Sequence, residues 1–201
     1  METRIAKTRE ELEEVFRLRY EVYVEEEKKF GGVHLPDKRI YDEFDDNPNT
    51  INLIMRENGK AISTVRFTGN RTEHEKLPSD KLYDFEPVRK DHAGLIPGNI
   101  GMLAIRKSYR SPKTFTALML SLGELLLKNK YDYYMFTLNH ECSNLFCRIM
   151  GAKMLTDKFW SEEICNYIIP MILYKEQVLE YVKKFEPKNI SEPEPVLALA
   201  F

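Results

Sequence analysis

An apolar strand that leads into a cluster of basic side chains is the feature of this sequence with the clearest chemical meaning. Residues 99–105 read Asn-Ile-Gly-Met-Leu-Ala-Ile, and a long apolar helix is expected to begin near Thr114. Between them lie Arg106, Arg110 and Lys113. Because unpaired amides and the helix dipole favour anions at a helix start, this loop predicts a phosphate site beside the sheet. The alternative is a solvated basic turn, and without glycines in the loop the side chains would do most of the holding.

A second set of charged side chains has the chemistry to hold an amino-acid-like amine. Arg19 and Tyr23 lie one helical turn apart, so both can face the acidic loop that contains Asp42 and Asp45. Arg66 follows on a predicted strand. An ammonium group needs a carboxylate and a carboxylate needs a guanidinium, so the set suits a zwitterion. The same charges could instead form an internal ion-pair network that pins the loop, and both interpretations stay open.

These side chains must be positioned by a fold of helices and strands. Thr8 and Glu11 form a capping box, and Asn58-Gly59 is the strongest short hairpin signal that a sequence offers. The patterns predict helices over residues 8–26, 114–130, 141–150 and 175–185, and strands over residues 50–57, 60–68, 99–105, 132–138, 152–157 and 165–174. Two long irregular segments, 27–49 and 69–97, are expected to be ordered loops, the second a lid or a pocket wall.

Length and composition set the outer bounds. The 201 residues predict one domain, residues 1–186, followed by a Pro- and Glu-rich tail, residues 187–201. A net charge of −2 gives no reason to expect a nucleic-acid partner. No stretch is long enough for a membrane span, and the first residues lack the apolar core of a signal peptide. Three cysteines favour reduced thiols in the cytoplasm, and the scattered histidines predict no metal site.

Three blocks of the sequence resemble one enzyme superfamily. Residues 18–24 read Leu-Arg-Tyr-Glu-Val-Tyr-Val, residues 42–45 read Asp-Glu-Phe-Asp, and residues 99–105 align with a strand of the type Glu-Ile-Ser-Arg-Leu-Ala-Val. Their order and spacing resemble the GNAT acyltransferase superfamily over most of the chain. Within it, the acyl-homoserine-lactone synthases and the related N-acyl amino acid synthases are the most similar. Asn99 and Met102 depart from the pattern, since an acidic and a charged residue are usual there.

The resemblance implies a fold, a donor and an acceptor. The fold is an α/β (α+β) GNAT fold with a mixed, mostly antiparallel twisted sheet flanked by helices, in which the strands at 99–105 and 132–138 splay apart. The donor is a phosphopantetheine thioester on an acyl carrier protein or coenzyme A, and the basic loop favours the acidic carrier protein. The acceptor is a small-molecule amine. The implied donor-binding residues are Met102, Ala104, Ile105, Arg106, Arg110, Lys113 and Thr114, and the acceptor-binding residues are Arg19, Tyr23, Asp42, Arg66 and Phe85.

Direct attack of the amine on the thioester is the expected reaction. The thioester would lie along the strand near Leu103, where a backbone amide polarises its carbonyl oxygen. The expected catalytic positions are Asp45, Asn99 and Leu103. Because the amide of Asn99 cannot take a proton, Asp45 or an ordered water chain is the expected base. Cys147 could protonate the departing thiolate, or it could be a small core residue.

Two other functions remain open from the sequence. Leu118, Met119 and Leu122 could wall a long acyl chain, but the same residues would be ordinary core in an acetyl-coenzyme A dependent N-acetyltransferase. The second alternative is a catalytically inactive fold that binds an acyl carrier, a reading based on Asn99 and Met102.

Overall fold

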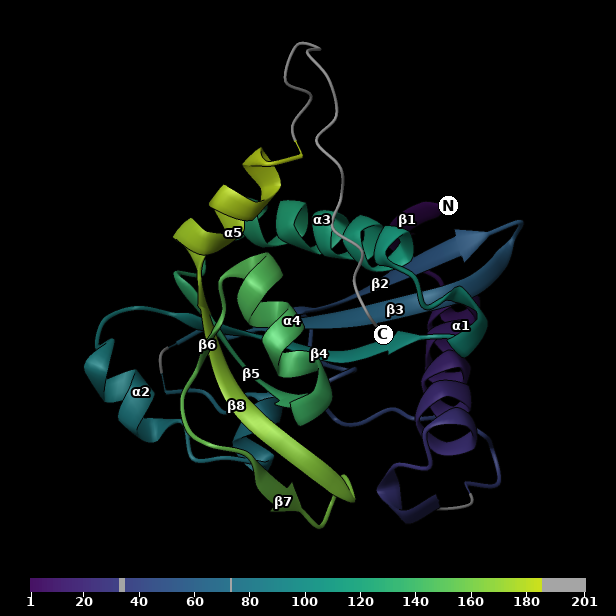
Figure 1. Cartoon of the computed structure of the whole chain (residues 1–201), viewed down its shortest axis with the longest axis horizontal. Coiled ribbons are helices and arrows are strands. Elements are labelled where there is room, and N and C mark those ends of the chain that lie inside the picture. The colour runs from purple at the N-terminus through teal and green to yellow at the C-terminus, as the bar shows by residue number, and fades with distance from the viewer. Residues whose placement is uncertain (33–34, 73, 186–201) are drawn as a thin grey trace.

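The computed structural model describes residues 1–32, 35–72 and 74–185 and contains an open eight-stranded sheet (Figure 1). The strands follow the order β1-β2-β3-β4-β5-β8-β6, and β7 also pairs with β8. The strands are β1 (Glu2–Ile5), β2 (Thr50–Glu57), β3 (Lys60–Gly69), β4 (Pro97–Ile105), β5 (Tyr133–Asn139), β6 (Lys153–Met154), β7 (Phe159–Ser161) and β8 (Asn166–Tyr174). The α-helices are α1 (Arg9–Tyr20), α2 (Glu86–Asp91), α3 (Pro112–Lys128), α4 (His140–Met150) and α5 (Lys175–Lys183). A π-helix, η1 (Glu21–Glu26), continues α1, and the short 3₁₀ turns are η2 (Phe30–Gly32), η3 (Pro78–Lys81) and η4 (Lys107–Tyr109).

The sheet opens between its two central strands. β4 and β5 are parallel, whereas the other pairings of the described strands are antiparallel. The parallel pairing covers only the register from Pro97 opposite Tyr133 to Asn99 opposite Met135. Beyond that point β4 stays paired with β3, and β5 stays paired with β8. The predicted fold class and the splayed central strands are therefore confirmed.

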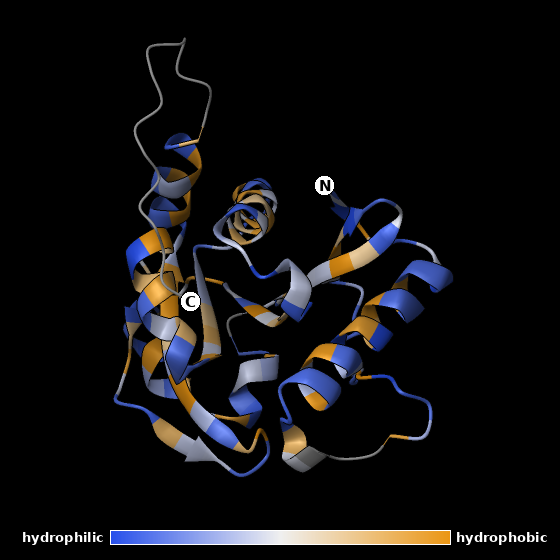
Figure 2. Cartoon of the chain, turned by 45° about the vertical axis from the view of Figure 1, so that its right-hand side comes forward, coloured by the Kyte–Doolittle hydropathy of each residue, from blue (hydrophilic) through white to orange (hydrophobic). Residues whose placement is uncertain are grey.

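Side chains alternate across the strands, so the sheet buries a core on each face. Tyr134 and Phe136 face a cluster with residues of α3, α4 and α5. Tyr133 and Met135 point the other way and pack with Phe85 of the segment between β3 and β4. A third cluster packs α1 and η1 against one face of β2, β3 and β4. Figure 2 shows this arrangement. The elements α1 and η1 lie on one side of the molecule, and α4, α5 and β8 lie on the other, with α3 above the point where β4 and β5 diverge.

Local signals placed several elements correctly. Thr8 and Glu11 form the capping box of α1, and Asn58 and Gly59 both adopt positive φ in the β2–β3 turn. Gly151 ends α4 in the left-handed conformation. The hairpin, the central strands and these helix boundaries are thus confirmed.

Other elements differ from the prediction. β1 and β7 were not predicted, because strands of four and three residues are held by their partners rather than by a sequence pattern. α3 begins at Pro112 rather than near Thr114, since Ser111 caps it. The predicted tail, residues 187–201, lies outside the described residues, so the domain boundary remains a prediction. Within the described ranges, no helix combines the length and the hydropathy that a membrane crossing requires.

Candidate functional site

A bulge in β4 marks the centre of the candidate site. Arg66 pairs with Gly101 and Thr64 with Ala104, so Met102 and Leu103 lie opposite the single residue between the two β3 positions. Met102 has a φ of 50°, a left-handed conformation that a non-glycine residue rarely adopts. A β-bulge bends its strand and redirects backbone groups. This one lies just beyond the last β4–β5 pair, where the edge of β4 that faces β5 becomes free.

Asn99 lies at the apex of the opening, where it holds β4, β5 and η3 together. Its buried amide nitrogen donates one hydrogen bond to the carbonyl oxygen of Met135, at 2.7 Å, and another to the hydroxyl of Ser79. Both amide hydrogens therefore bind protein atoms. The first holds β4 against β5, and the second ties η3 to the same point. The sequence placed Asn99 among the catalytic positions, and the geometry gives it a bracing contact at the apex.

Tyr23 reaches the bulge from the other side. Its hydroxyl donates a hydrogen bond of 2.8 Å to the carbonyl oxygen of Leu103. Burial raises the pKa of the Tyr23 phenol, so it stays protonated and remains a donor. The sequence allowed Tyr23 to face the acidic loop together with Arg19, but its hydroxyl bonds Leu103 of β4 instead. Arg19 belongs to α1, whereas Tyr23 belongs to the π-helix, whose wider turn rotates it toward β4.

The charges of the acidic loop meet two buried arginines. Arg19 bonds the carboxylate of Asp45 at 2.9 and 3.0 Å, and its other terminal nitrogen donates to Asn52. Arg66 makes a bidentate pair with Asp42, at 2.6 and 3.0 Å, and also contacts Asp45 at 2.9 Å. The side chains of Arg19, Arg66 and Asp45 are at most 1% exposed, against 22% for Asp42. This network balances two positive and two negative charges, and Asp42 is its most exposed charged member.

Asp45 is poorly suited to be a base. Burial alone would raise the pKa of its carboxyl group, but the guanidinium groups of Arg19 and Arg66 outweigh burial and hold the pKa below its usual value. A carboxylate held this way has little tendency to accept a proton. The geometry therefore favours Asp45 as a brace for the loop, against the expectation that it is the general base.

Several predicted binding residues are closed off by packing. Phe85 is fully buried with Leu77, Tyr133 and Met135, so it stabilises the segment between β3 and β4 rather than contacting an acceptor. Thr114 is buried at the start of α3, and its hydroxyl contacts that of Ser111. The proposed acyl walls Leu118, Met119 and Leu122, and the donor position Ala104, are likewise buried in core clusters. Leu103, Met102 and Ile105 are only partly buried, so these three remain accessible candidates.

The basic loop after β4 is paired with acidic residues of η1 and the turn that follows it. Arg106 forms an ion pair with Glu21, and Arg110 contacts Glu26 at 3.1 Å and Glu27 at 2.7 Å. The sequence treated these arginines as open to a phosphate. Their acidic partners could not be predicted from the sequence, because more than 80 residues separate η1 from the loop after β4. Lys113 is exposed on the first turn of α3.

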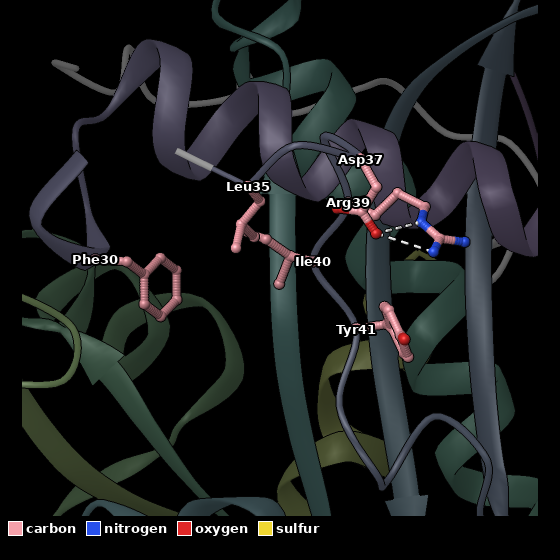
Figure 3. A pocket seen from close by; sticks show the side chains of 6 residues that line it. All are labelled: Phe30, Leu35, Asp37, Arg39, Ile40 and Tyr41. Atoms are coloured by element: carbon pink, nitrogen blue, oxygen red, sulfur yellow. Dashed lines mark hydrogen bonds and ion pairs between the residues drawn. The ribbon is translucent and has the colours of Figure 1, made fainter. Parts of the chain in front are cut away.

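An apolar hollow lies in the segment between η1 and β2, which the sequence described only as a loop. Its volume is about 370 Å³. Figure 3 shows the side chains around it, with an ion pair at its rim between Arg39 and Asp37. Phe30 and Ile40 on its wall belong to the same cluster as Met102. The six lining residues are Phe30, Leu35, Asp37, Arg39, Ile40 and Tyr41.

Cys147 packs against the core, and burial raises the pKa of its thiol, as expected for a small core residue. The described residues include no group of three or more His, Cys, Asp or Glu side chains arranged to hold a metal ion. His34 lies outside the described residues.

Comparisons with known proteins agree with this geometry. The family model described as N-acyl amino acid synthase FeeM matches residues 14–174. No curated protein matches the sequence. Among solved structures, FeeM, an N-acyl amino acid synthase from uncultured soil microbes, superposes with a TM-score of 0.71 and 16% identity, over 90% of this chain and 99% of FeeM. BjaI, a CoA-dependent acyl-homoserine lactone synthase solved with SAM and isopentyl-CoA, gives 0.64 and 17%, over 97% and 93%. ElaA from Escherichia coli gives 0.62 and 14%, over 86% and 99%. At these identities the superpositions show a shared fold.

Proposed function

The chain belongs to the N-acyl amino acid synthase FeeM family, and we propose that it is an N-acyltransferase that moves an acyl group from a phosphopantetheine thioester to an amino-acid-like amine. The observation that carries this proposal is the opening between β4 and β5 directly beside the bulge at Met102 and Leu103. The match to the family model confirms the family resemblance seen in the sequence, and the choice of donor and acceptor is the proposal.

The donor side of the site suits an extended, amide-containing chain. Beyond Asn99, the β4 edge that faces β5 carries backbone groups without a strand partner. Phosphopantetheine has two amides, so it can pair with such an edge as an added strand does. Its thioester would then lie near Leu103, and its phosphate near the loop that begins at Arg106.

The acceptor side offers one accessible carboxylate and an apolar hollow. Asp42 is the network member that a ligand ammonium can approach, and the hollow lined by Phe30 and Ile40 has room for an apolar side chain. In the reaction the amine nitrogen forms a bond to the carbonyl carbon as the carbon–sulfur bond breaks. The amine loses a proton to water, and the thiolate takes one up. Asp45 supports this by fixing the loop that carries Asp42.

Thioester turnover with a matched panel of donors tests the proposal. Acetyl, octanoyl and palmitoyl groups are supplied on acyl carrier protein and on coenzyme A, each with a mixture of amino acids. Free thiol and N-acyl product are measured together. We expect thiol release that depends on the amine, with a long acyl group in the product. Turnover of the acetyl-coenzyme A thioester alone would favour a small-molecule acetyltransferase, and binding without thiol release would favour an inactive carrier-binding fold.

A pair of tryptophan substitutions tests the location of the donor. Leu103 is partly exposed at the bulge, whereas Leu95 is 40% exposed on the loop before β4. Leu103→Trp should fill the opening and reduce kcat/KM at least tenfold, while Leu95→Trp adds the same side chain elsewhere and should leave it unchanged. Equal activity of both folded variants would place the donor away from the opening.

An acyl carrier protein as partner and a cytoplasmic location belong to the same proposal. The three cysteines are free thiols, as expected of a protein kept in a reducing compartment. Copurification with acyl carrier protein and cell fractionation are the direct checks.

A further inference from the structure

The π-helix η1 and the residue after it direct carboxylates at the loop where the donor phosphate is expected. Glu26 accepts the backbone N–H of Lys107 at 2.9 and 3.2 Å and contacts Arg110 at 3.1 Å. Glu27 accepts a second contact from the same arginine at 2.7 Å. A carboxylate on a backbone amide and a guanidinium uses the donors that phosphate uses in such loops. The chain thus places its own anions on these donors.

The π-helical conformation makes this arrangement possible. Glu21 and Glu26 are five residues apart, and both contact the loop after β4. In an α-helix, at 3.6 residues per turn, such positions point in widely different directions, whereas the wider π-helical turn brings them closer to one face. Glu25 lies on the same turn but pairs with Lys38, away from the loop. The contact with the loop is therefore specific to some of the η1 carboxylates.

The loop itself is held in place. The Nε of Arg110 donates to the carbonyl oxygen of Ile105 at 3.0 Å, and the hydroxyl of Ser111 accepts the N–H of Thr114. Pro112 has no N–H to offer. The amide of Lys107 and the guanidinium of Arg110 are two hydrogen-bond donors of this loop that a phosphate could use, and both contact Glu26.

We propose that Glu26 and Glu27 determine donor specificity by disfavouring free coenzyme A thioesters relative to carrier-borne ones. Coenzyme A carries a pyrophosphate and a 3′-phosphate, whereas phosphopantetheine on a carrier protein has a single phosphodiester. The more highly charged donor meets more repulsion from the two carboxylates and must displace them from Lys107 and Arg110. The carrier-borne donor meets less. This inference rests on the proposed function, because it assigns the donor preference of the same site.

The test compares a double substitution with a control on the same helix turn. Glu26→Gln with Glu27→Gln removes the two carboxylate charges that contact Lys107 and Arg110, and Glu25→Gln removes one charge that does not contact the loop. Binding of coenzyme A itself is measured by calorimetry, and kcat/KM is measured for one acyl group on both donors. We expect the double variant to bind coenzyme A about tenfold more tightly, which corresponds to about 1.4 kcal/mol. The ratio of kcat/KM for acyl-coenzyme A to that for the acyl carrier protein should rise by a similar factor.

The salt dependence of coenzyme A binding provides a second test. Because the double variant leaves the charge of Arg110 without a carboxylate partner, its affinity for coenzyme A should fall more steeply with ionic strength than that of the wild type. Unchanged binding, an equal change for both donors, or the same gain in Glu25→Gln would overturn the inference. Should the double variant fail to fold, Glu26→Gln alone decides the same question. If the wild type turns over no thioester, the proposed function fails, while coenzyme A binding still tests the role of the carboxylates.

Discussion

The hydroxyl of Tyr23 donates a hydrogen bond to the carbonyl oxygen of Leu103 and so joins the π-helix to the bulge of β4, across 80 residues of sequence. Tyr23 is 8% exposed. The contact holds the part of β4 that is free of β5 in a fixed position. A backbone segment that must orient a thioester needs such support, because small displacements of reacting groups are costly in rate.

Tyr23→Phe should therefore lower turnover as well as stability. The lost hydrogen bond leaves a carbonyl group unpaired, which costs about 1–3 kcal/mol. Tyr134→Phe is the matched control, because Tyr134 makes a similar bond of 2.9 Å to Leu126 within the core. Urea unfolding should show comparable losses in the two variants, while kcat should fall only in Tyr23→Phe. An equal fall in kcat in Tyr23→Phe and Tyr134→Phe would mean that the Tyr23 contact has no special role in turnover.

Asp45→Asn should act chiefly on folding. It leaves the buried guanidinium groups of Arg19 and Arg66 with less negative charge, and breaking such a pair costs about 3–5 kcal/mol. The exposed neighbour Asp46, changed to Asn, should have no comparable effect. Catalysis is measured at a temperature at which both variants are folded. A loss in kcat/KM of about 10² or more for folded Asp45→Asn would restore its role as general base.

The same carboxylate predicts an acid-sensitive part of the stability. The pKa of Asp45 is lower in the folded chain than its ordinary value of 3.8, so its contribution is complete above that value. The contribution is lost as the pH falls through the lower folded pKa. The free energy of unfolding of the wild type should thus decrease more steeply below about pH 4 than that of Asp45→Asn. Identical slopes in denaturant titrations at several pH values would contradict this account.

Asn99→Asp should loosen the apex of the opening. A carboxylate cannot donate to Met135 or Ser79, so about 2–3 kcal/mol of stability should be lost at neutral pH. The acid form can donate one bond, and the loss should shrink as the pH is lowered. Asn70→Asp is the control, since the buried Asn70 donates to the carbonyl oxygen of Glu75 rather than to β5. Under conditions in which both variants are equally stable, activity should be lower in Asn99→Asp than in Asn70→Asp. Equal activity would mean that the contacts of Asn99 at the apex are not needed for turnover.

Gly98→Ala should strain the paired end of β4. A Cβ atom at Gly98 would lie 2.7 Å from the ring of Phe67 and 3.0 Å from that of Tyr134. Overpacking of this kind costs about 1–3 kcal/mol. Phe67→Leu should offset part of the loss, and a double-mutant cycle on unfolding free energies measures the coupling. If the losses in unfolding free energy are additive, the added methyl group is accommodated by a shift of β4 rather than of the Phe67 ring.

The sequence by itself determined the features that depend on neighbours a few positions away. The capping pair Thr8 and Glu11, the turn at Asn58-Gly59 and the helix end at Gly151 each follow from local backbone chemistry. The same is true of the family, because its motifs are short runs of residues. The order of elements then fixed the fold class.

The tertiary structure decided which groups are free to act. Arg106 and Arg110 looked available in sequence, yet their partners lie on the π-helix and the residue after it, 83 to 85 positions away. Tyr23 turned to β4 rather than to the acidic loop, and Phe85 entered a core. The charge of a side chain is written in the sequence, but its partner and its burial depend on segments that only folding brings together. For this chain, that difference separates a basic loop open to phosphate from one that already carries its own carboxylates.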